Sequence, residues 1–315
     1  MWYLGVDLGG TKILTAVVDE TGQVAARVRA PTPQTGPAAV VEAIAATAQQ
    51  ALEAAGLPRG AVRAAGVGAP GPADPVTGTV FSPPNLPGWG DVPLADLLRA
   101  RLEVPVAVEN DANAAALGEH WVGAGRGVDD LLYITVGTGI GGGLILRGQL
   151  YTGTSGCAGE VGHMVIVPDG PRCACGRQGC LEAVASGPAI ARAARAALEA
   201  GRPSVLSAVA AEELDAHAVA RAAVEGDPLA REVFARAARY LGLAVANLVN
   251  LLNPAMVIIG GGVARAGDLL LAPVRRIVDA EAFARPAAAV RIVPAALGAD
   301  AGALGAVAAA RQRLA

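Results

Sequence analysis

One imidazole and three thiols lie close together along the chain, and they have the clearest chemistry. His163 is followed by the pattern Cys-x-Cys-x₄-Cys, which contains Cys173, Cys175 and Cys180. One histidine and three cysteines can complete a closed tetrahedral zinc site, which is structural rather than catalytic. Reduced cysteines without a metal are the alternative, but glycines at the turns of this segment let a short chain wrap a metal ion. The sequence therefore predicts a structural Zn²⁺.

Two carboxylates flank this cluster. Glu160 lies three residues before His163, and Glu182 lies two residues after Cys180. A metal that fixes the loop would also fix both carboxylates, and a ligand rich in hydroxyl groups needs such fixed acceptors. We therefore expect zinc to act as a scaffold for a polar pocket. Cys157 lies outside this set and is expected to be a small buried residue.

Asn110 and Asp111 follow a predicted strand and open a predicted helix. Position alone favours Asp111 as the cap of that helix. Open α/β sheets, however, bind their ligands at the carboxyl ends of strands, and phosphoryl transfer to an alcohol needs a carboxylate that accepts the hydroxyl proton. Asp111 is therefore the candidate base. Glu109 is its rival, because alternation along Val106–Glu109 leaves the direction of its side chain open.

Two glycine-rich turns could bind phosphate. The first is Asp7-Leu-Gly-Gly-Thr-Lys12, whose glycines let backbone amides approach phosphate oxygens and whose Thr11 and Lys12 add donors. The second is Gly137-Thr-Gly-Ile-Gly-Gly-Gly143. Neither fits the P-loop, and neither opens a helix as a Rossmann turn does. A β-hairpin can carry two glycines without binding anything, but two equivalent hairpins could hold the phosphates of a nucleotide from both sides.

The elements that must position these residues follow a repeated order. Strands are predicted at 3–7, 13–19 and 23–29 around the first glycine turn, and at 131–136 and 144–147 around the second. Both halves begin with strand, glycine-rich hairpin and strand, which predicts a duplicated unit with a cleft between the copies rather than a solenoid. Further strands are expected at 64–68, 104–108, 256–259 and 290–293, and helices at 38–55, 93–102, 111–120, 188–200, 216–225, 228–252, 267–282 and 301–314. The loop 74–89 is rich in proline and glycine, long for a passive connection, and so a candidate binding loop.

Composition fits one large α/β unit or two domains. The 315 residues are 53% hydrophobic and 3% aromatic, so a sizeable core of aliphatic side chains is expected. The net charge of −3 argues against a general nucleic-acid binder. No apolar segment has the uninterrupted length that a membrane span needs, and Met1 leads into a strand without the basic start and apolar run of a signal peptide. We therefore expect a cytoplasmic protein that binds neither nucleic acid nor membrane.

Five motifs occur together and in order: Asp-Leu-Gly-Gly-Thr-Lys, Glu-Asn-Asp-Ala-Asn, Thr-Val-Gly-Thr-Gly-Ile-Gly-Gly-Gly, Glu-Val-Gly-His and Cys-x-Cys-Gly-x-x-Gly-Cys-Leu-Glu. With them the chain resembles the ROK family of sugar kinases along essentially its whole length, and most of all the bacterial glucokinases of that family. The resemblance implies an α/β, actin-like (ribonuclease H-like) ATPase fold with two lobes that close on a sugar. It also implies a kinase that uses ATP and Mg²⁺ and assembles as a homodimer or homotetramer.

The resemblance also implies roles for single residues. Asp111 matches the catalytic base for the sugar hydroxyl, and Asp7 matches a carboxylate placed toward Mg²⁺. His163 matches both a zinc ligand and a sugar contact, with one ring nitrogen for each. Further sugar contacts match Asn110, Glu160, Glu182 and, in the loop Ser82–Trp89 with its extra proline, Asn85. The phosphate and nucleotide positions match Gly9, Gly10, Thr11, Lys12, Thr138, Gly139 and Gly261.

The expected reaction is phosphorylation of a hexose, most readily glucose, at its 6-hydroxyl. A small lobe at residues 1–110, completed by about 299–315, and a large lobe at 111–298 would close on it. Another hexose, an N-acetylhexosamine, or polyphosphate in place of ATP are alternatives within this chemistry. A sugar-responsive ROK regulator is the alternative from another class, but such regulators carry a helix-turn-helix segment before the core, and no basic recognition helix precedes the first glycine turn here.

Overall fold

The computed structural model describes residues 1–83 and 85–314, and the chain divides into two compact units. Unit 1 contains Met1–Asp129, Gly143–Gly159 and the C-terminal residues from Ala296, and unit 2 contains Asp130–Gly142 and Glu160–Ala295. Pro84 of the predicted sugar loop and Ala315 of the predicted small lobe lie outside the described residues. The predicted lobes divide the chain differently, between residues 110 and 111, and that division stays a prediction.

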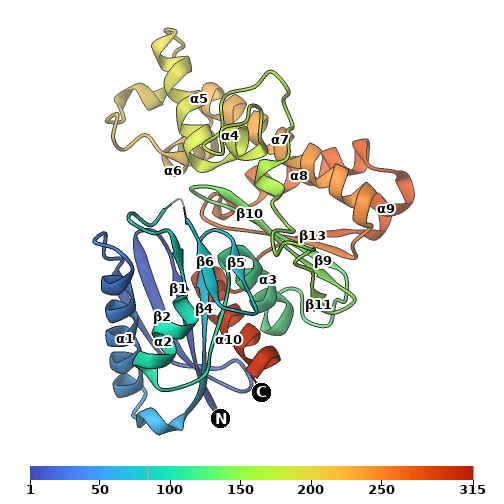
Figure 1. Cartoon of the computed structure of the whole chain (residues 1–315). Coiled ribbons are helices and arrows are strands. Elements are labelled where there is room, and N and C mark those ends of the chain that lie inside the picture. Colours follow the sequence, from blue (N-terminus) through green and yellow to red (C-terminus); the bar gives the residue numbers. More distant parts are fainter. Residues whose placement is uncertain (84, 315) are drawn as a thin grey trace. The chain divides into compact units, whose positions relative to one another are not determined.

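A five-stranded sheet with the order β3-β2-β1-β4-β8 forms the centre of unit 1 (Figure 1). β1 pairs antiparallel with β2 and parallel with β4, and β4 pairs parallel with β8. The carboxyl ends of β1, β4 and β8 therefore meet at one edge, where Asp7 pairs with Gly68 and Gly68 with Glu109. The strands are β1 (Trp2–Leu8), β2 (Lys12–Asp19), β3 (Val24–Pro31), β4 (Val62–Ala69) and β8 (Val106–Asn110).

Helices cover both faces of this sheet, as the nearly continuous burial of β1, β2 and β4 requires. On one face, α1 (Pro37–Ala54) and α2 (Leu94–Leu102) contribute to a core that includes Val6 of β1 and Ile44 of α1. On the other face, α10 (Ala301–Leu314) contributes Leu304 and Val307 to a second core (Figure 1). The helix α3 (Asp111–Val122) packs along α10.

Glycines let α10 approach the sheet backbone to backbone. A Cβ on Gly5 would lie 2.2 Å from the carbonyl oxygen of Ala303, and a Cβ on Gly66 would lie 1.8 Å from that of Ala306. Gly305 does the same on the side of α3, because a Cβ there would lie 1.5 Å from the carbonyl oxygen of Ala114. No residue with a side chain fits at these positions without moving the helix.

A second five-stranded sheet has the order β11-β10-β9-β12-β13. In each sheet the strands, counted along the chain, lie in the order third, second, first, fourth, fifth, so the predicted duplication is confirmed. The strands are β9 (Leu131–Val136), β10 (Ile140–Leu146), β11 (Gln149–Leu150), β12 (Met256–Gly260) and β13 (Arg291–Pro294). The helices of unit 2 are α4 (Leu181–Ala185), α5 (Gly187–Glu199), α6 (Ala216–Val224), α7 (Pro228–Leu252), α8 (Asp268–Glu281) and α9 (Ala284–Ala289).

The second glycine turn is shorter than predicted. Gly141–Gly143 belong to β10, which already begins at Ile140. A Cβ on Gly143 would lie 2.6 Å from the Cβ of Ala116, so this glycine serves close packing against α3 rather than a turn. The expectation of one glycine turn from Gly137 to Gly143 is therefore wrong, and the turn is confined to Gly137–Gly139.

The described residues of the proline-rich loop 74–89 are also more regular than their composition suggests. It contains part of a small sheet formed by β5 (Ala73–Asp74), β6 (Thr79–Phe81) and β7 (Asp91–Val92). These strands are too short for an alternating pattern to be recognised in the sequence. Across residues 1–83 and 85–314, no helix has the length and apolar character needed to cross a membrane.

Candidate active site

Asp111 lies at the edge of the first sheet where the parallel strands end. It is the first residue of α3, directly after β8. Asp7, near the end of β1, lies two strands away, and β4 with Gly68 runs between them. Neighbouring strands are about 4.8 Å apart, so the backbones at these two carboxylates are separated by roughly 10 Å. Burial raises the pKa of Asp7, while the Lys12 ammonium lowers it less strongly.

The start of α3 shows which residue caps this helix. The side-chain oxygen of Asn110 accepts hydrogen bonds from the backbone N–H groups of Ala112 at 2.9 Å and Asn113 at 3.1 Å. Asn110 is therefore the N-cap, and its side-chain nitrogen donates to the carbonyl oxygen of Gly71 at 3.1 Å. Asp111 follows the cap and is partly exposed, with one carboxylate oxygen accepting from Ala112 N–H at 2.8 Å. The alternative that Asp111 is merely the cap does not hold.

Glu109, the rival base, faces the interior. Its side chain is 2% exposed. One oxygen accepts hydrogen bonds from the backbone N–H of Asn110 at 2.9 Å and from the side-chain amide of Asn113 at 3.0 Å. The other oxygen forms an ion pair with Arg313. A base must come within hydrogen-bond reach of the substrate proton, and both oxygens of Glu109 are engaged by the protein.

The first glycine turn joins β1 to β2 and is braced by the segment after β3. Gly9 N–H donates to the carbonyl oxygen of Lys12 at 2.9 Å, and the Thr32 hydroxyl donates to the carbonyl oxygen of Gly9 at 2.7 Å. The side chain of Gln34 donates to the carbonyl oxygen of Gly10 at 2.9 Å. These bonds hold the turn in one conformation, with Lys12 exposed beside it.

Asn85 of the predicted sugar loop lies against this turn. A Cβ on Gly10 would lie 2.8 Å from the carbonyl oxygen of Asn85 and 2.9 Å from its Cβ. The exposed Thr11 follows Gly10 in the same turn. Unit 1 therefore places Gly10, Thr11 and Asn85 next to one another.

The cysteine cluster of unit 2 has the spacing of a tetrahedral metal site. The ligand atoms of His163, Cys173, Cys175 and Cys180 all lie within 4.8 Å of one another. The Sγ atoms of Cys175 and Cys180 are 3.6 Å apart, and Cys173 Sγ lies 3.7 Å from His163 Nδ1. Zn–S bonds of about 2.3 Å in a tetrahedron would place ligand atoms roughly 3.8 Å apart. The residues present therefore fit a zinc ion.

The surrounding protein groups shift the pKa values of the three thiols in different directions. Burial raises the pKa of Cys173 to about 12 and also raises that of Cys180. A hydrogen bond from the backbone of Arg177 lowers the pKa of Cys175 to about 6. Zinc ligands must be thiolates, so a bound metal would have to stabilise the deprotonated forms of Cys173 and Cys180, while Cys175 is already disposed toward its thiolate.

Both flanking carboxylates approach this cluster. Nδ1 of His163 faces Cys173, while Nε2 lies 3.9 Å from a carboxylate oxygen of Glu160. One oxygen of Glu182 accepts a hydrogen bond from the backbone N–H of Ile140 at 3.0 Å, and the other lies 3.7 Å from Cys173 Sγ. Glu182 therefore links the cysteine cluster to the end of the second glycine turn, a contact that the sequence did not reveal.

The second glycine turn lies at the carboxyl ends of two parallel strands, β9 and β12. Gly137 N–H donates to the carbonyl oxygen of Gly139 at 2.9 Å, which closes the turn around Thr138. Gly261 follows β12 with a φ of +88°, and a Cβ there would lie 2.4 Å from the carbonyl oxygen of Val136. Thr138, Gly139 and Gly261 are therefore gathered at one edge of the second sheet.

Three residues without a sequence-based role have different surroundings. Cys157 is exposed, so the expectation that it is buried is wrong; it follows a glycine in a loop rather than an apolar element. Burial lowers the pKa of His120, and the Asp129 carboxylate opposes this shift. His217 lies beside the glycine segment after β12, because a Cβ on Gly262 would lie 3.8 Å from its Nε2. The approach of His217 to this segment left no signal in the sequence.

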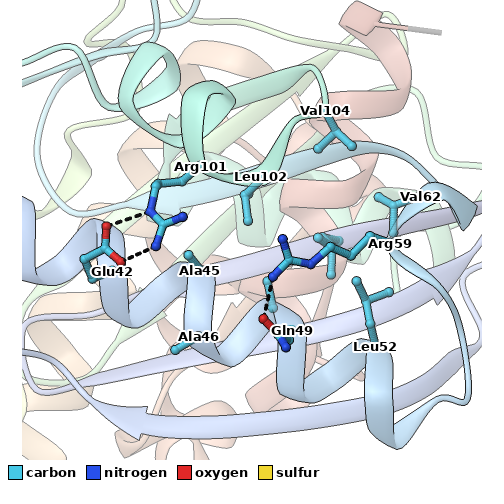
Figure 2. A pocket seen from close by; sticks show the side chains of 12 residues that line it. Glu42, Ala45, Ala46, Gln49, Leu52, Arg59, Val62, Arg101, Leu102 and Val104 are labelled. Carbon is cyan, nitrogen blue, oxygen red and sulfur yellow. Dashed lines mark hydrogen bonds and ion pairs between the residues drawn. The ribbon is translucent and has the colours of Figure 1, made fainter.

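A separate hollow of about 200 Å³ lies in unit 1 between α1 and the end of α2 (Figure 2). Arg101 forms two hydrogen bonds with Glu42 at 2.7 and 2.6 Å, and Arg59 pairs with Gln49 (Figure 2). None of the residues that line this hollow is a predicted site residue.

Comparison with known proteins connects this arrangement to a family. The family model described as "ROK family" matches residues 3–313. The chain is 41% identical over 312 residues to a glucokinase from Halalkalibacterium halodurans, covering 96% of this chain and 93% of that protein. It is 40% identical to a ROK family glucokinase from Streptomyces griseus solved in complex with glucose and AMPPNP, with a TM-score of 0.86 and coverage of 99% and 100%. A ROK family transcriptional regulator, a homologue of the E. coli MLC protein, is similar at 30% identity and a TM-score of 0.89, covering 98% of this chain and 78% of that chain.

Proposed function

Because the chain belongs to the ROK family, we propose that it is a sugar kinase that transfers the γ-phosphoryl group of ATP to the 6-hydroxyl of glucose. The observation that carries this proposal is 40% identity, over 99% of the chain, to a glucokinase whose structure holds glucose and an ATP analogue. The fold is the expected α/β, actin-like fold. A cytoplasmic location and a homodimer or homotetramer stay predictions.

Asp111 is proposed as the base that accepts the proton of the 6-hydroxyl. Support comes from its place at the carboxyl edge of parallel strands and from a partly exposed side chain at the first turn of α3. Phosphoryl transfer is catalysed mainly by positioning and electrostatics. Asp111 is therefore expected to contribute a carboxylate held within hydrogen-bond reach of the acceptor hydroxyl.

The two glycine turns are proposed to bind the phosphates of ATP. In unit 1 the backbone amides from Gly9 to Lys12 would donate to phosphate oxygens, and in unit 2 those of Thr138 and Gly139 would do the same. Gly261 would lie near the adenosine. Mg²⁺, when bound, neutralises charge on the transferring phosphoryl group, and Asp7 supplies the kind of oxygen ligand that it prefers.

The hydroxyl groups of the sugar are proposed to contact Asn110, Glu160, His163 and Glu182, with Asn85 as a further contact from the loop before β7. The arrangement of His163 supports its double role, since Nδ1 faces the cysteine cluster and Nε2 faces Glu160. We propose that His163, Cys173, Cys175 and Cys180 bind a structural Zn²⁺, which would fix the imidazole and leave its second nitrogen as a donor.

A coupled phosphorylation assay with Mg²⁺ tests the function. We expect the highest kcat/KM for glucose and ATP among glucose, mannose, fructose, N-acetylglucosamine and N-acetylmannosamine, with polyphosphate as the competing donor. Asp111→Asn should abolish turnover while glucose still binds, and Asp279→Asn, at an exposed position of α8, is the matched control.

The outcomes separate the alternatives. Turnover of Asp111→Asn at the rate of the control would rule out Asp111 as the base. Preference for an N-acetylated sugar or for polyphosphate would keep the kinase and change its substrate. Sugar binding without turnover of any sugar, with either donor, would favour a regulator of the kind found among the similar structures.

A further inference from the structure

The carboxylate next to the proposed base belongs to a buried network that reaches the last turn of the chain. Glu109 is 2% exposed and shares an ion pair with Arg313 of α10. Arg313 also donates to the carbonyl oxygen of Val108 at 2.9 Å. The guanidinium therefore holds both the backbone and the side chain at the end of β8, the strand that delivers Asp111.

Glu109 passes this constraint on to the first turn of α3. Its Oε1 accepts hydrogen bonds from the backbone N–H of Asn110 and the side-chain amide of Asn113, one on each side of Asp111 in the sequence. The cap oxygen of Asn110 in turn holds the N–H groups of Ala112 and Asn113. Hydrogen bonds that begin at the buried Glu109 carboxylate therefore fix the backbone from residue 110 to residue 113. The direction of the Asp111 side chain depends on that backbone.

The position of Arg313 is itself rigid. α10 runs antiparallel to α3, since Ala301 lies against Gly118, Gly305 against Ala114, and Arg313 against Glu109. The contact at Gly305 is backbone to backbone, which leaves α10 little freedom to slide. A charge pair at the end of such a helix can act as a fixed support.

We propose that Glu109 and Arg313 are positioning residues for the phosphoryl transfer: they hold the Asn110–Asn113 turn so that the Asp111 carboxylate points at the acceptor hydroxyl. This inference rests on the proposed kinase function. Neither residue touches a substrate in this proposal, and both act through Asp111. A displacement of about 1 Å at a reacting group lowers turnover by roughly 100-fold, so loss of the support is expected to reduce kcat.

An isosteric substitution disturbs the network in a defined way. Glu109→Gln keeps the size of the side chain but has one oxygen for two sets of donors. If that oxygen faces Arg313, the new NH₂ group faces the N–H of Asn110; if it faces Asn110, the NH₂ group faces Arg313. In either orientation the NH₂ group faces another N–H donor without an acceptor between them, so the turn must shift. Arg313→Met instead leaves the Glu109 carboxylate buried without its cation, which is strongly destabilising.

The experiment is a double-mutant cycle of Glu109→Gln, Arg313→Met and the double variant, with kcat, the KM for ATP and glucose binding measured for each. Arg311→Met is the matched control, because Arg311 lies on the same helix and stacks over Trp121 instead. We expect each single variant to lose about 30- to 100-fold in kcat with the KM for ATP within about two-fold of wild type. The double variant, which buries no unpaired charge, should lose no more than the worse single variant. Arg313→Lys keeps the charge and serves if Arg313→Met does not fold; it should retain more activity than either single variant.

Losses that multiply in the double variant, or a kcat for Glu109→Gln and Arg313→Met within about three-fold of Arg311→Met, would overturn the proposal. If Arg313→Met does not fold, a kcat for Arg313→Lys below that of Glu109→Gln would overturn it instead. Backbone hydrogen exchange at residues 110–113 separates it from the proposed function, because it does not require turnover. Faster exchange of these amides in Glu109→Gln than in wild type is expected, and equal rates would overturn the positioning role even if the wild-type protein phosphorylated no sugar.

Discussion

Glu119 offers a sharp test of how a buried carboxyl group contributes to the stability of unit 1. It is 0% exposed in the last turn of α3. One of its oxygens accepts from the backbone N–H groups of Ala124 at 2.8 Å and Ala296 at 3.1 Å, and the other from that of Leu297 at 2.8 Å. Ala296 is the residue at which the chain enters unit 1 for the last time. The Glu119 side chain therefore joins the segment at Ala296–Leu297 to α3 through hydrogen bonds.

The expected cost follows from the number of donors left without an acceptor. A buried N–H without a partner costs about 1–3 kcal/mol, so Glu119→Gln, which keeps one oxygen and turns an NH₂ group toward at least one donor, should lower the free energy of unfolding by about 2 kcal/mol. Glu119→Ala leaves three donors unpaired and should cost about 3–5 kcal/mol once water enters the space. Either value is a large part of the total of about 5–15 kcal/mol that is usual for a domain.

Urea unfolding followed by tryptophan fluorescence measures this cost for unit 1, because Trp2, Trp89 and Trp121 all belong to that unit. The control is Glu42→Gln, which removes the charge of an exposed partner of Arg101 (Figure 2) and should leave the midpoint unchanged. The reasoning is refuted if the urea midpoint of Glu119→Gln equals that of Glu42→Gln. The same would hold if Glu119→Ala were no less stable than Glu119→Gln.

Further predictions concern the metal, a carboxylate and the last helix. Cys175→Ser should remove bound zinc, measured by metal analysis, and weaken glucose binding, whereas the exposed Cys157→Ser should do neither; a metal-free Cys175→Ser variant with normal sugar affinity would contradict the scaffold role. Burial raises the pKa of Asp7, so the folded protein holds this proton more tightly and ionisation lowers stability as the pH rises from the unfolded-state value. Asp7→Asn should therefore raise the melting temperature at pH 8, with a gain that shrinks toward pH 4; a constant or reversed difference would contradict this. Gly305→Ala should cost about 3 kcal/mol through overpacking, while Gly60→Ala, where a Cβ would meet nothing within 4 Å, should be neutral in the same melts.

Local patterns were enough to predict most elements, since periodicity and caps are recorded in neighbouring residues. The bounds of α7 and α10 were predicted without error, because proline begins the first and a run rich in alanine, a strong helix former, makes up the second. The short α9 was missed, because six residues with a proline inside show no helical period. The glycines at 141–143 misled the prediction because glycine marks both turns and places of close packing, and only the neighbouring helix tells them apart.

Contacts between distant residues were beyond sequence reasoning. Glu109 and Arg313 are 204 residues apart, and neither residue type nor spacing points from one to the other. Alternation along β8 left the direction of Glu109 open, and its burial against α10 decided it. The cysteine cluster was the opposite case, because its ligands lie within a short segment and their spacing carries the information.

The packing of α10 against the first sheet has a consequence for how the protein is made. The face of the sheet that contains Tyr3, Leu14 and Val18 packs against the helix at residues 301–314, with Trp121 and Val122 of α3 at its side. During synthesis at about 5–20 residues per second, this apolar face is complete once β8 is made and stays without α10 for roughly 10–40 s. Unit 2 needs no residue after Ala295, so it is complete before α10 is made. A chain cut between residues 295 and 301 would therefore contain all of unit 2 and an uncovered apolar face of the first sheet, which is prone to aggregation.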